Sequence, residues 1–387
     1  MYKILTLNNI AVAGLRRLPR ASYEVASEIQ HPDAVLVRSF KMHDWSVPAG
    51  LKAIGRAGAG VNNIPVAEMS AQGIVVFNTP GANANAVKEL VLAGMLMAAR
   101  NIAPALDYVH GLTGTDHELH QQVEAGKKKF VGFELPGRTL AVVGLGAIGV
   151  RVANAAVGLG MRVIGYDPHI TVSNAWQLSA QVEKVSSIDT LLAQADFVSL
   201  HVPLIEATRN LINSDRLRVA KEGLTLLNFA RDGIVDDQAV VDALQTGRLN
   251  GYVCDFPSNT LKGHPQVIAL PHLGASTREA EENCAVMVAD QVREYLENGT
   301  VTNSVNFPEM VMPRNGGHRL LVVNANVPHM IERISSAIAC ADINILDLLN
   351  KSRGDIACTL VDVACPIPSS VIDDISATDG VLAVRAL

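Results

Sequence analysis

Residues 140–167 read LAVVGLGAIGVRVANAAVGLGMRVIGYD, and this stretch decides the fold. An apolar run typical of a strand leads into a G-x-G-x-x-G turn made by Gly144, Gly146 and Gly149, and a second apolar run ends at Asp167. Gly144 permits the tight turn, Gly146 lets the backbone approach a pyrophosphate, and Gly149 lets a helix pack closely on the strand. The order strand, glycine turn, helix, strand, acid predicts a dinucleotide-binding unit.

The chemistry of this unit favours NAD. The helix that begins near Ala147 and Ile148 offers free N–H groups and partial positive charge to phosphates. Asp167 can accept hydrogen bonds from ribose hydroxyls, and its carboxylate would repel the 2′-phosphate of NADP. The alternative is an ordinary βαβ crossover with a glycine turn.

Composition limits the classes of partner. The chain has 387 residues, 49% of them hydrophobic, and a net charge of −6, which argues against nucleic acid as the main partner. Five cysteines form no C-x-x-C pair and are interpreted as reduced thiols in a cytoplasmic protein, with no metal site. The opening MYKILTLNNI enters a strand-like run, so we expect no signal peptide, and 90–99 is too short an apolar stretch to span a membrane.

Alternating strands and helices predict two doubly wound parallel α/β domains, a flavodoxin-like one and a Rossmann one. We expect a substrate-binding domain over 1–99 with 277–306 and an NAD-binding domain over 100–276, connected by long helices at 87–99 and 277–297. Two prolines and a glycine pair predict a linker over 307–317. Residues 318–387 then follow the order strand, helix, strand, strand, helix, strand, which is typical of a ferredoxin-like domain.

Polar or glycine residues follow each predicted strand of the second domain. Ligands bind beyond the carboxyl ends of strands in such sheets, so we expect the chemistry there. These positions are Asp167, His201-Val202-Pro203, Arg231-Asp232-Gly233, Asp255 and His272-Leu273-Gly274.

Five segments in order resemble the D-isomer-specific 2-hydroxyacid dehydrogenase family. They are GRAGAGV at 55–61, NTPG at 78–81, GLGAIG at 144–149, NFARDGIVD at 228–236 and PHLGAST at 271–277. The C-terminal domain resembles the ACT domains that bind small amino acids, a combination typical of family members that oxidise D-3-phosphoglycerate. The resemblance covers about residues 3–306 and implies NAD as the cofactor.

The resemblance also implies site residues. His272 would be the catalytic acid/base, a role that suits a side chain titrating near neutral pH. Arg231 would hold the substrate carboxylate with its planar fork and polarise the carbonyl. The alternatives are a hydrogen-bonded structural histidine and a salt bridge at a helix start. Asp255 would face the nicotinamide carboxamide or cap a turn.

The remaining binding residues follow from the same resemblance. Arg38 and Arg56 match basic positions that reach the substrate phosphate or carboxylate. The backbone of Ala59, Gly60 and Val61 would offer N–H groups to the carboxylate, and Lys127 matches a basic residue that reaches the active site of a neighbouring subunit. The alternative for each of these three charged side chains is an ordinary surface charge. The implied cofactor contacts are Gly144, Gly146, Ala147, Ile148, Gly149, Asp167, Val202, Pro203, Phe229, Ala230, Arg231, Asp255, His272 and Gly274.

The sequence departs from the family at two points. The family pairs its catalytic histidine with a Glu in the loop after the aspartate, but residues 256–265 contain no carboxylate, so His272 would be less firmly oriented. Either Asp255 or an acid elsewhere substitutes, or the histidine acts unassisted. In the ACT-like domain, Asn326 and Asn344 match ligand positions whereas Asn324 replaces a His, which leaves both a serine effector and a purely structural domain open.

We therefore expect a homodimeric or homotetrameric NAD-dependent enzyme that oxidises D-3-phosphoglycerate to 3-phosphohydroxypyruvate, the first step towards serine. One alternative is a dehydrogenase for another D-2-hydroxy acid, disfavoured by Arg38 and Arg56 together with the ACT-like domain, which suit a phosphorylated precursor of an amino acid. The other is a non-catalytic NAD(H)-sensing protein, disfavoured by His272 and Arg231.

Overall fold

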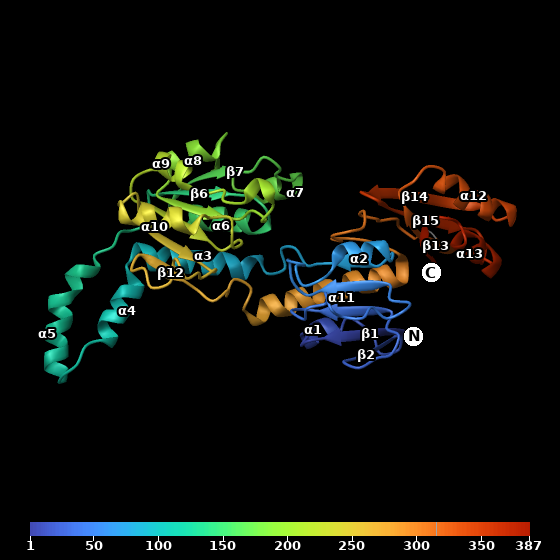
Figure 1. Ribbon diagram of the computed structural model, residues 1–387, viewed down its shortest axis with the longest axis horizontal. Coiled ribbons are helices and arrows are strands. Elements are labelled where there is room, and N and C mark those ends of the chain that lie inside the picture. Colours follow the sequence, from blue (N-terminus) through green and yellow to red (C-terminus); the bar gives the residue numbers. More distant parts are fainter. Residues whose placement is uncertain (315) are drawn as a thin grey trace. The chain divides into compact units, whose positions relative to one another are not determined.

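The computed structural model describes residues 1–314 and 316–387 (Figure 1). Its contacts divide the chain into two compact units. Unit 1 comprises Met1–Asn83 with Arg278–Leu387, and unit 2 comprises Ala84–Thr277.

The first sheet of unit 1 is parallel, with strand order β2-β1-β3-β4-β5, which is the flavodoxin-like order. Its strands are β1 (Tyr2–Leu7), β2 (Tyr23–Ala26), β3 (Ala34–Val37), β4 (Ala53–Arg56) and β5 (Val75–Phe77). The helices are α1 (Val12–Leu15), α2 (Val66–Ala71) and the long α11 (Arg278–Asn298). Helix α11 buries Val288 and Val292 against this sheet, and β3 is buried along its whole length.

Unit 2 contains a seven-stranded parallel sheet of order β12-β11-β10-β9-β6-β7-β8, in which the order reverses at β6 as in Rossmann folds. The strands are β6 (Thr139–Val143), β7 (Arg162–Tyr166), β8 (Glu183–Lys184), β9 (Phe197–Leu200), β10 (Leu224–Asn228), β11 (Leu249–Cys254) and β12 (Val267–Ala269). The expected α/β class with two doubly wound sheets is confirmed.

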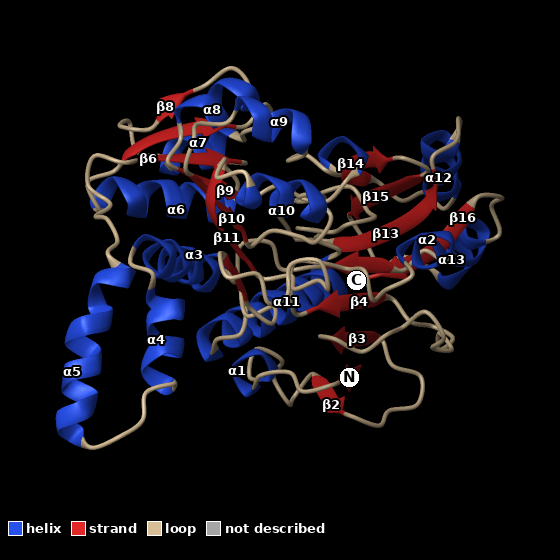
Figure 2. Cartoon of the chain, turned by 60° about the vertical axis from the view of Figure 1, so that its left-hand side comes forward, coloured by secondary structure: helices blue, strands red, loops and turns tan. Residues whose placement is uncertain are grey.

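Helices cover the Rossmann sheet and extend beyond it. They are α3 (Ala84–Ala99), α4 (Ile102–His110), α5 (Asp116–Gly126), η1 (Lys127–Phe130), α6 (Ala147–Gly158), α7 (Val172–Gln177), α8 (Ile188–Gln194), η2 (Glu206–Thr208), α9 (Ser214–Val219) and α10 (Asp237–Gln245). Helix α5 begins at a capping box formed by Thr115 and Glu118. Helices α4 and α5 form an arm that projects from the sheet of this unit (Figures 1 and 2).

A smaller antiparallel sheet lies in unit 1, with the order β14-β15-β13-β16 of a ferredoxin-like domain. Its elements are β13 (His318–Ala325), α12 (Met330–Cys340), β14 (Ile345–Arg353), β15 (Ile356–Val363), α13 (Ser369–Ser376) and β16 (Val381–Ala386). Alternate residues serve two cores, since Leu320 and Val322 pack with α12 and α13, whereas Leu321 and Val323 share a core with α11. The preceding segment contributes Phe307, Met310 and Met312 to that second core.

Within the described residues, no single helix is both long and apolar enough to cross a membrane. Within these residues, α3 and α4 together have the length and apolar composition of a membrane span, but the two helices are bent by 67° relative to each other.

Candidate functional site

The glycine turn after β6 has the geometry that a dinucleotide requires. Gly144 has φ +89°, and a Cβ at Gly149 would stand 1.9 Å from the Gly144 carbonyl oxygen, so a side chain is excluded there. At Gly146, in contrast, an added Cβ would meet nothing within 4 Å. The backbone N–H groups of Gly146, Ala147 and Ile148 find no acceptor among the described residues. The turn therefore presents open space and free donors, which fits a pyrophosphate.

The acid at the end of β7 is held beside this turn. Asp167 accepts hydrogen bonds from the Leu145 N–H at 2.7 Å and from the His169 N–H at 2.8 Å. These bonds orient its carboxylate at the carboxyl edge of the sheet, where a ribose would bind. Val202 also lies close to the turn, because its Cγ1 would be 3.0 Å from a Cβ on Gly144. The residues present fit a bound NAD.

A partly buried histidine follows β9 next to the turn. His201 Nε2 and Ser199 Oγ are 2.8 Å apart, and Nδ1 has no partner within the described residues. Burial lowers the pKa of His201 to about 3, so the ring is neutral at physiological pH.

The turn after β10 is shaped by a buried amide. Asn228 is 2% exposed, its Oδ1 accepts from the Ala230 N–H at 3.2 Å, and its Nδ2 donates to the Arg231 carbonyl at 3.0 Å. These bonds present Arg231 to solvent while Phe229 stays buried. Arg231 Nη1 donates to the Ala230 carbonyl at 2.6 Å, and the other donors of this exposed guanidinium can bind a carboxylate.

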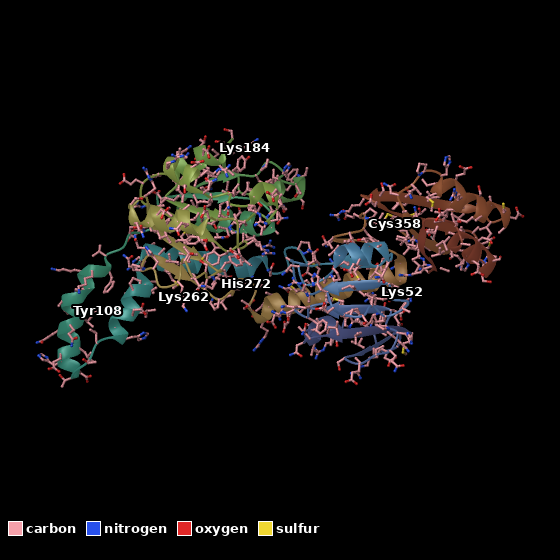
Figure 3. All side chains as sticks on the ribbon, in the orientation of Figure 1. Lys52, Tyr108, Lys184, Lys262, His272 and Cys358 are labelled. Atoms are coloured by element: carbon pink, nitrogen blue, oxygen red, sulfur yellow. The ribbon has the colours of Figure 1, made fainter. Side chains whose placement is uncertain are left out.

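His272 follows β12, and Figure 3 labels it on this segment. Its backbone has the unusual φ of +56°, its N–H donates to the Asp255 carbonyl at 3.1 Å, and the next two N–H groups donate to the Asp255 carboxylate, each at 2.7 Å. Of the two roles expected for Asp255, the structure shows its carboxylate capping this turn. The side chain of His272 is exposed.

The neighbour of the imidazole is aromatic rather than acidic. The rings of Phe256 and His272 lie 5.0 Å apart in an edge arrangement. Within the described residues, no hydrogen bond or ion pair joins the His272 ring to a carboxylate. The contacts found for His272 are thus an aromatic ring beside its imidazole and the Asp255 turn, which holds its backbone.

Unit 1 brings the two expected substrate arginines together. Asn63 accepts from Arg56 Nε at 3.1 Å and donates to the carbonyl groups of Arg38 and Phe40, so it ties both strand ends to one amide. The thiol of Cys284 on α11 lies within electrostatic reach of both guanidinium groups. The pair forms a local basic site in a chain that is acidic overall.

The glycine-rich loop beside these arginines presents unused donors. The Ala59 carbonyl accepts from Asn78 Nδ2 at 2.6 Å, which fixes the loop. The backbone N–H groups of Ala59, Gly60 and Val61 donate to nothing within residues 1–314 and 316–387. This arrangement fits an anionic group.

The other expected residues lie elsewhere. Lys127 is exposed in η1 and paired with Glu124. In the C-terminal domain, Asn324 is buried and Asn326 Nδ2 donates to the Gly354 carbonyl at 3.0 Å, whereas Asn344 is exposed.

Three residues that contact the expected site residues were not predicted from the sequence: Asn63, Asn228 and Glu281, whose carboxylate forms an ion pair with Arg38 at 2.7 Å. Asn228 is the last residue of the buried strand β10 and Asn63 follows a glycine-rich turn, which is a usable signal for residues that shape a loop. Glu281 is one of several acids on α11, and nothing in its local sequence distinguishes it.

Comparisons with known proteins agree with this geometry. Residues 92–274 match the family model of the D-isomer specific 2-hydroxyacid dehydrogenase NAD binding domain. The D-3-phosphoglycerate dehydrogenase of Methanocaldococcus jannaschii is 37% identical over 302 residues, covering 76% of this chain and 55% of that protein. That of Haemophilus influenzae is 34% identical over 349 residues, covering 87% and 81%.

A solved structure supports the same conclusion. The NAD⁺-bound 3-phosphoglycerate dehydrogenase of Entamoeba histolytica superposes with a TM-score of 0.62 at 29% identity, covering 79% of this chain and 98% of that one. The chain spans about half the length of several curated relatives, such as those of Methanocaldococcus jannaschii and Synechocystis. The glycine turn, the strand-end residues and these similarities lead to one conclusion: the chain belongs to the D-isomer-specific 2-hydroxyacid dehydrogenase family.

Proposed function

We propose that this protein catalyses the NAD-dependent oxidation of D-3-phosphoglycerate to 3-phosphohydroxypyruvate, the first step towards serine. The observation that carries the substrate is that Asn63 bonds to the Arg56 guanidinium and to the backbone carbonyl of Arg38, next to a glycine-rich loop whose N–H groups have no acceptor among the described residues. Two guanidinium groups and a backbone nest suit a phosphate better than an uncharged side chain. The names of curated relatives from several organisms support the same substrate.

The residues of unit 2 supply the catalytic groups in this proposal. The glycine turn and Asp167 would hold NAD, which would supply the acceptor for the hydride that leaves C2 of the substrate. His272 takes the hydroxyl proton on its imidazole, and Arg231 holds the carboxylate. Phe256 packs at the edge of the histidine ring and Asp255 fixes its backbone, so orientation comes from packing and a capped turn.

Replacement of His272 tests the reaction. Asparagine tolerates the left-handed backbone of this position, so His272→Asn should fold normally while kcat falls by roughly 10²- to 10⁴-fold, the usual contribution of an acid/base group. His31→Asn is the matched control, because His31 is an exposed histidine with φ +52°. NADH oxidation would be followed with 3-phosphohydroxypyruvate and a panel of other 2-oxo acids. Full activity in His272→Asn, or preference for an unphosphorylated 2-oxo acid, would refute the assignment.

A second protomer is part of the proposal. Leu106 and Val109 on α4 are 51% and 53% exposed, and Val123 on α5 adds to this apolar surface of the projecting arm. An exposed apolar surface of this kind is typical of an interface between subunits. Sedimentation analysis of wild type and Leu106→Asp would test a homodimer, which we expect the aspartate to weaken.

For the C-terminal domain we propose binding of a small amino acid, with serine as the first ligand to test. The buried Asn324 supports this, because its Oδ1 has no partner within the described residues. Calorimetry with millimolar serine decides between an effector site and a structural domain. We place the enzyme in the cytoplasm, where free thiols such as those of Cys340 and Cys365 stay reduced.

A further inference from the structure

Arg38, at the carboxyl end of β3, is paired with an acid from a distant part of the chain. Its Nη1 lies 2.7 Å from Oε1 of Glu281, which belongs to the first turn of α11. The side chains are 34% and 44% exposed, so solvent and small solutes reach the pair.

This ion pair belongs to the basic site of unit 1. The Cys284 thiol, three residues after Glu281 on α11, lies within electrostatic reach of Arg38, Arg56 and Glu281 together. The cluster therefore contains two positive groups and one negative group, and Glu281 offsets half of the positive charge.

Carboxylates and phosphates bind a guanidinium through the same planar donors. A phosphate that approaches Arg38 thus meets a donor that is already engaged. We propose that Glu281 is a built-in counter-ion of the substrate-anion site, which an incoming phosphate displaces from Arg38. This inference rests on the proposed function, in which Arg38 binds the phosphate.

The exchange has two consequences. Phosphate binding replaces one charge-assisted contact of Arg38 by another. The affinity for the phosphorylated substrate is therefore lower than it would be if Arg38 had no counter-ion. A phosphate dianion carries more charge than the carboxylate it displaces, whereas a monoanionic group gains little from the exchange. Glu281 is therefore a positioning residue that determines the specificity for phosphorylated substrates. Its replacement should change KM and leave kcat unchanged.

The test compares two adjacent acids on the same helix. Glu281→Gln removes the counter-ion, whereas Glu282→Gln makes the same change of charge at an exposed residue that forms no ion pair with the part of the chain that the structure describes. Calorimetry with 3-phosphoglycerate and with inorganic phosphate should show roughly three- to fivefold tighter binding to Glu281→Gln, as expected for a partly exposed ion pair. The KM for 3-phosphohydroxypyruvate should fall in parallel at unchanged kcat, while Glu282→Gln resembles wild type.

Equal or weaker phosphate binding in Glu281→Gln would overturn the inference, as would the same tightening in Glu282→Gln, which would reflect overall charge alone. Thermal unfolding of both variants verifies that they fold. Failure of the wild-type enzyme to turn over 3-phosphohydroxypyruvate would refute the proposed function instead, and the titration with inorganic phosphate would still decide the role of Glu281.

Discussion

Asp255 holds the backbone of Gly274: its Oδ2 accepts the Gly274 N–H at 2.7 Å, and its Oδ1 accepts the Leu273 N–H at the same distance. The aspartate is 1% exposed, so water does not replace these bonds. The segment that begins at His272 is thereby fixed to the end of β11.

Asp255→Asn should lower both stability and turnover. The amide keeps one acceptor oxygen and places an NH2 group against the other N–H, which leaves a buried donor unpaired at a cost of about 1–3 kcal/mol. A shift of His272 by a fraction of an ångström should reduce kcat at least tenfold by the general sensitivity of catalysis to geometry. Urea unfolding and NADH oxidation measure the two effects. Asp232→Asn, at an exposed acid after β10, should change neither, and an Asp255→Asn enzyme with normal kcat would contradict the positioning role.

Alanine at two glycines of the turn should separate folding from cofactor binding. Gly149→Ala places a methyl group 1.9 Å from the Gly144 carbonyl, so we expect clear destabilisation, of the order of 1–3 kcal/mol for an overpacked site. Gly146→Ala meets nothing within 4 Å, so stability should stay within about 0.5 kcal/mol of wild type while NADH affinity falls at least tenfold. Thermal unfolding and NADH fluorescence titration report the two quantities. Normal NADH binding by Gly146→Ala would place the pyrophosphate elsewhere.

His201 should make the fold sensitive to acid. Its pKa is about 3 in the folded protein, lowered by burial, against about 6.5 in an unfolded chain. Below pH 6.5 the unfolded chain binds a proton that the folded protein does not, so stability falls as the pH decreases from 6.5 towards 3. Between pH 7 and pH 5 this single group should lower the free energy of unfolding by about 2 kcal/mol. Urea titrations of wild type and His201→Gln at both pH values test this, and equal acid dependence in the two proteins would exclude His201 as the cause.

A buried ion pair should be essential to the C-terminal domain. Arg319 donates to both oxygens of Asp362, at 2.6 and 2.7 Å, and to the carbonyl groups of Asn298, Met312 and Pro313. Arg319→Met leaves the Asp362 carboxylate buried without its partner, which should cost about 3–5 kcal/mol.

The double variant Arg319→Met/Asp362→Leu should recover most of this loss, since it buries no charge. Arg333→Met is an exposed control. Denaturant unfolding measures all three proteins, and a double variant as unstable as the single one would show that the carbonyl contacts of Arg319, rather than its charge, hold the domain.

Much of the fold was predictable because its signals are local. Predominantly apolar runs such as 139–143 and 197–200 become fully buried parallel strands, and the glycine spacing at 144–149 specifies its own turn. The edge strand β2 and the arm of α4 and α5 were not predicted. Strand β2 has only four residues and is half polar, and the arm has few buried side chains within the chain that would produce a strong apolar pattern.

In the candidate site, too, some features were predictable from local sequence signals and others were not. His272, Arg231 and Asp167 were predicted as site residues because they follow predicted strands, and ligands bind beyond the carboxyl ends of the strands in parallel sheets. The hydrogen-bond and ion-pair partners of the site residues were not predictable from the sequence. Asp255 contacts residues eighteen and nineteen positions further along the chain, and Glu281 pairs with Arg38 across more than two hundred residues.

The sequence by itself determined the two doubly wound sheets, the ferredoxin-like domain and the dinucleotide turn, since periodicity and glycine positions act over a few residues. Only the tertiary structure decided that Asp255 caps the histidine turn, that the Phe256 ring packs beside the His272 ring, and that Glu281 forms an ion pair with Arg38. The reason is physical: hydrogen bonds and ion pairs act over a few ångströms in space, and only the packing of α11 and the strand ends brings their partners within that distance.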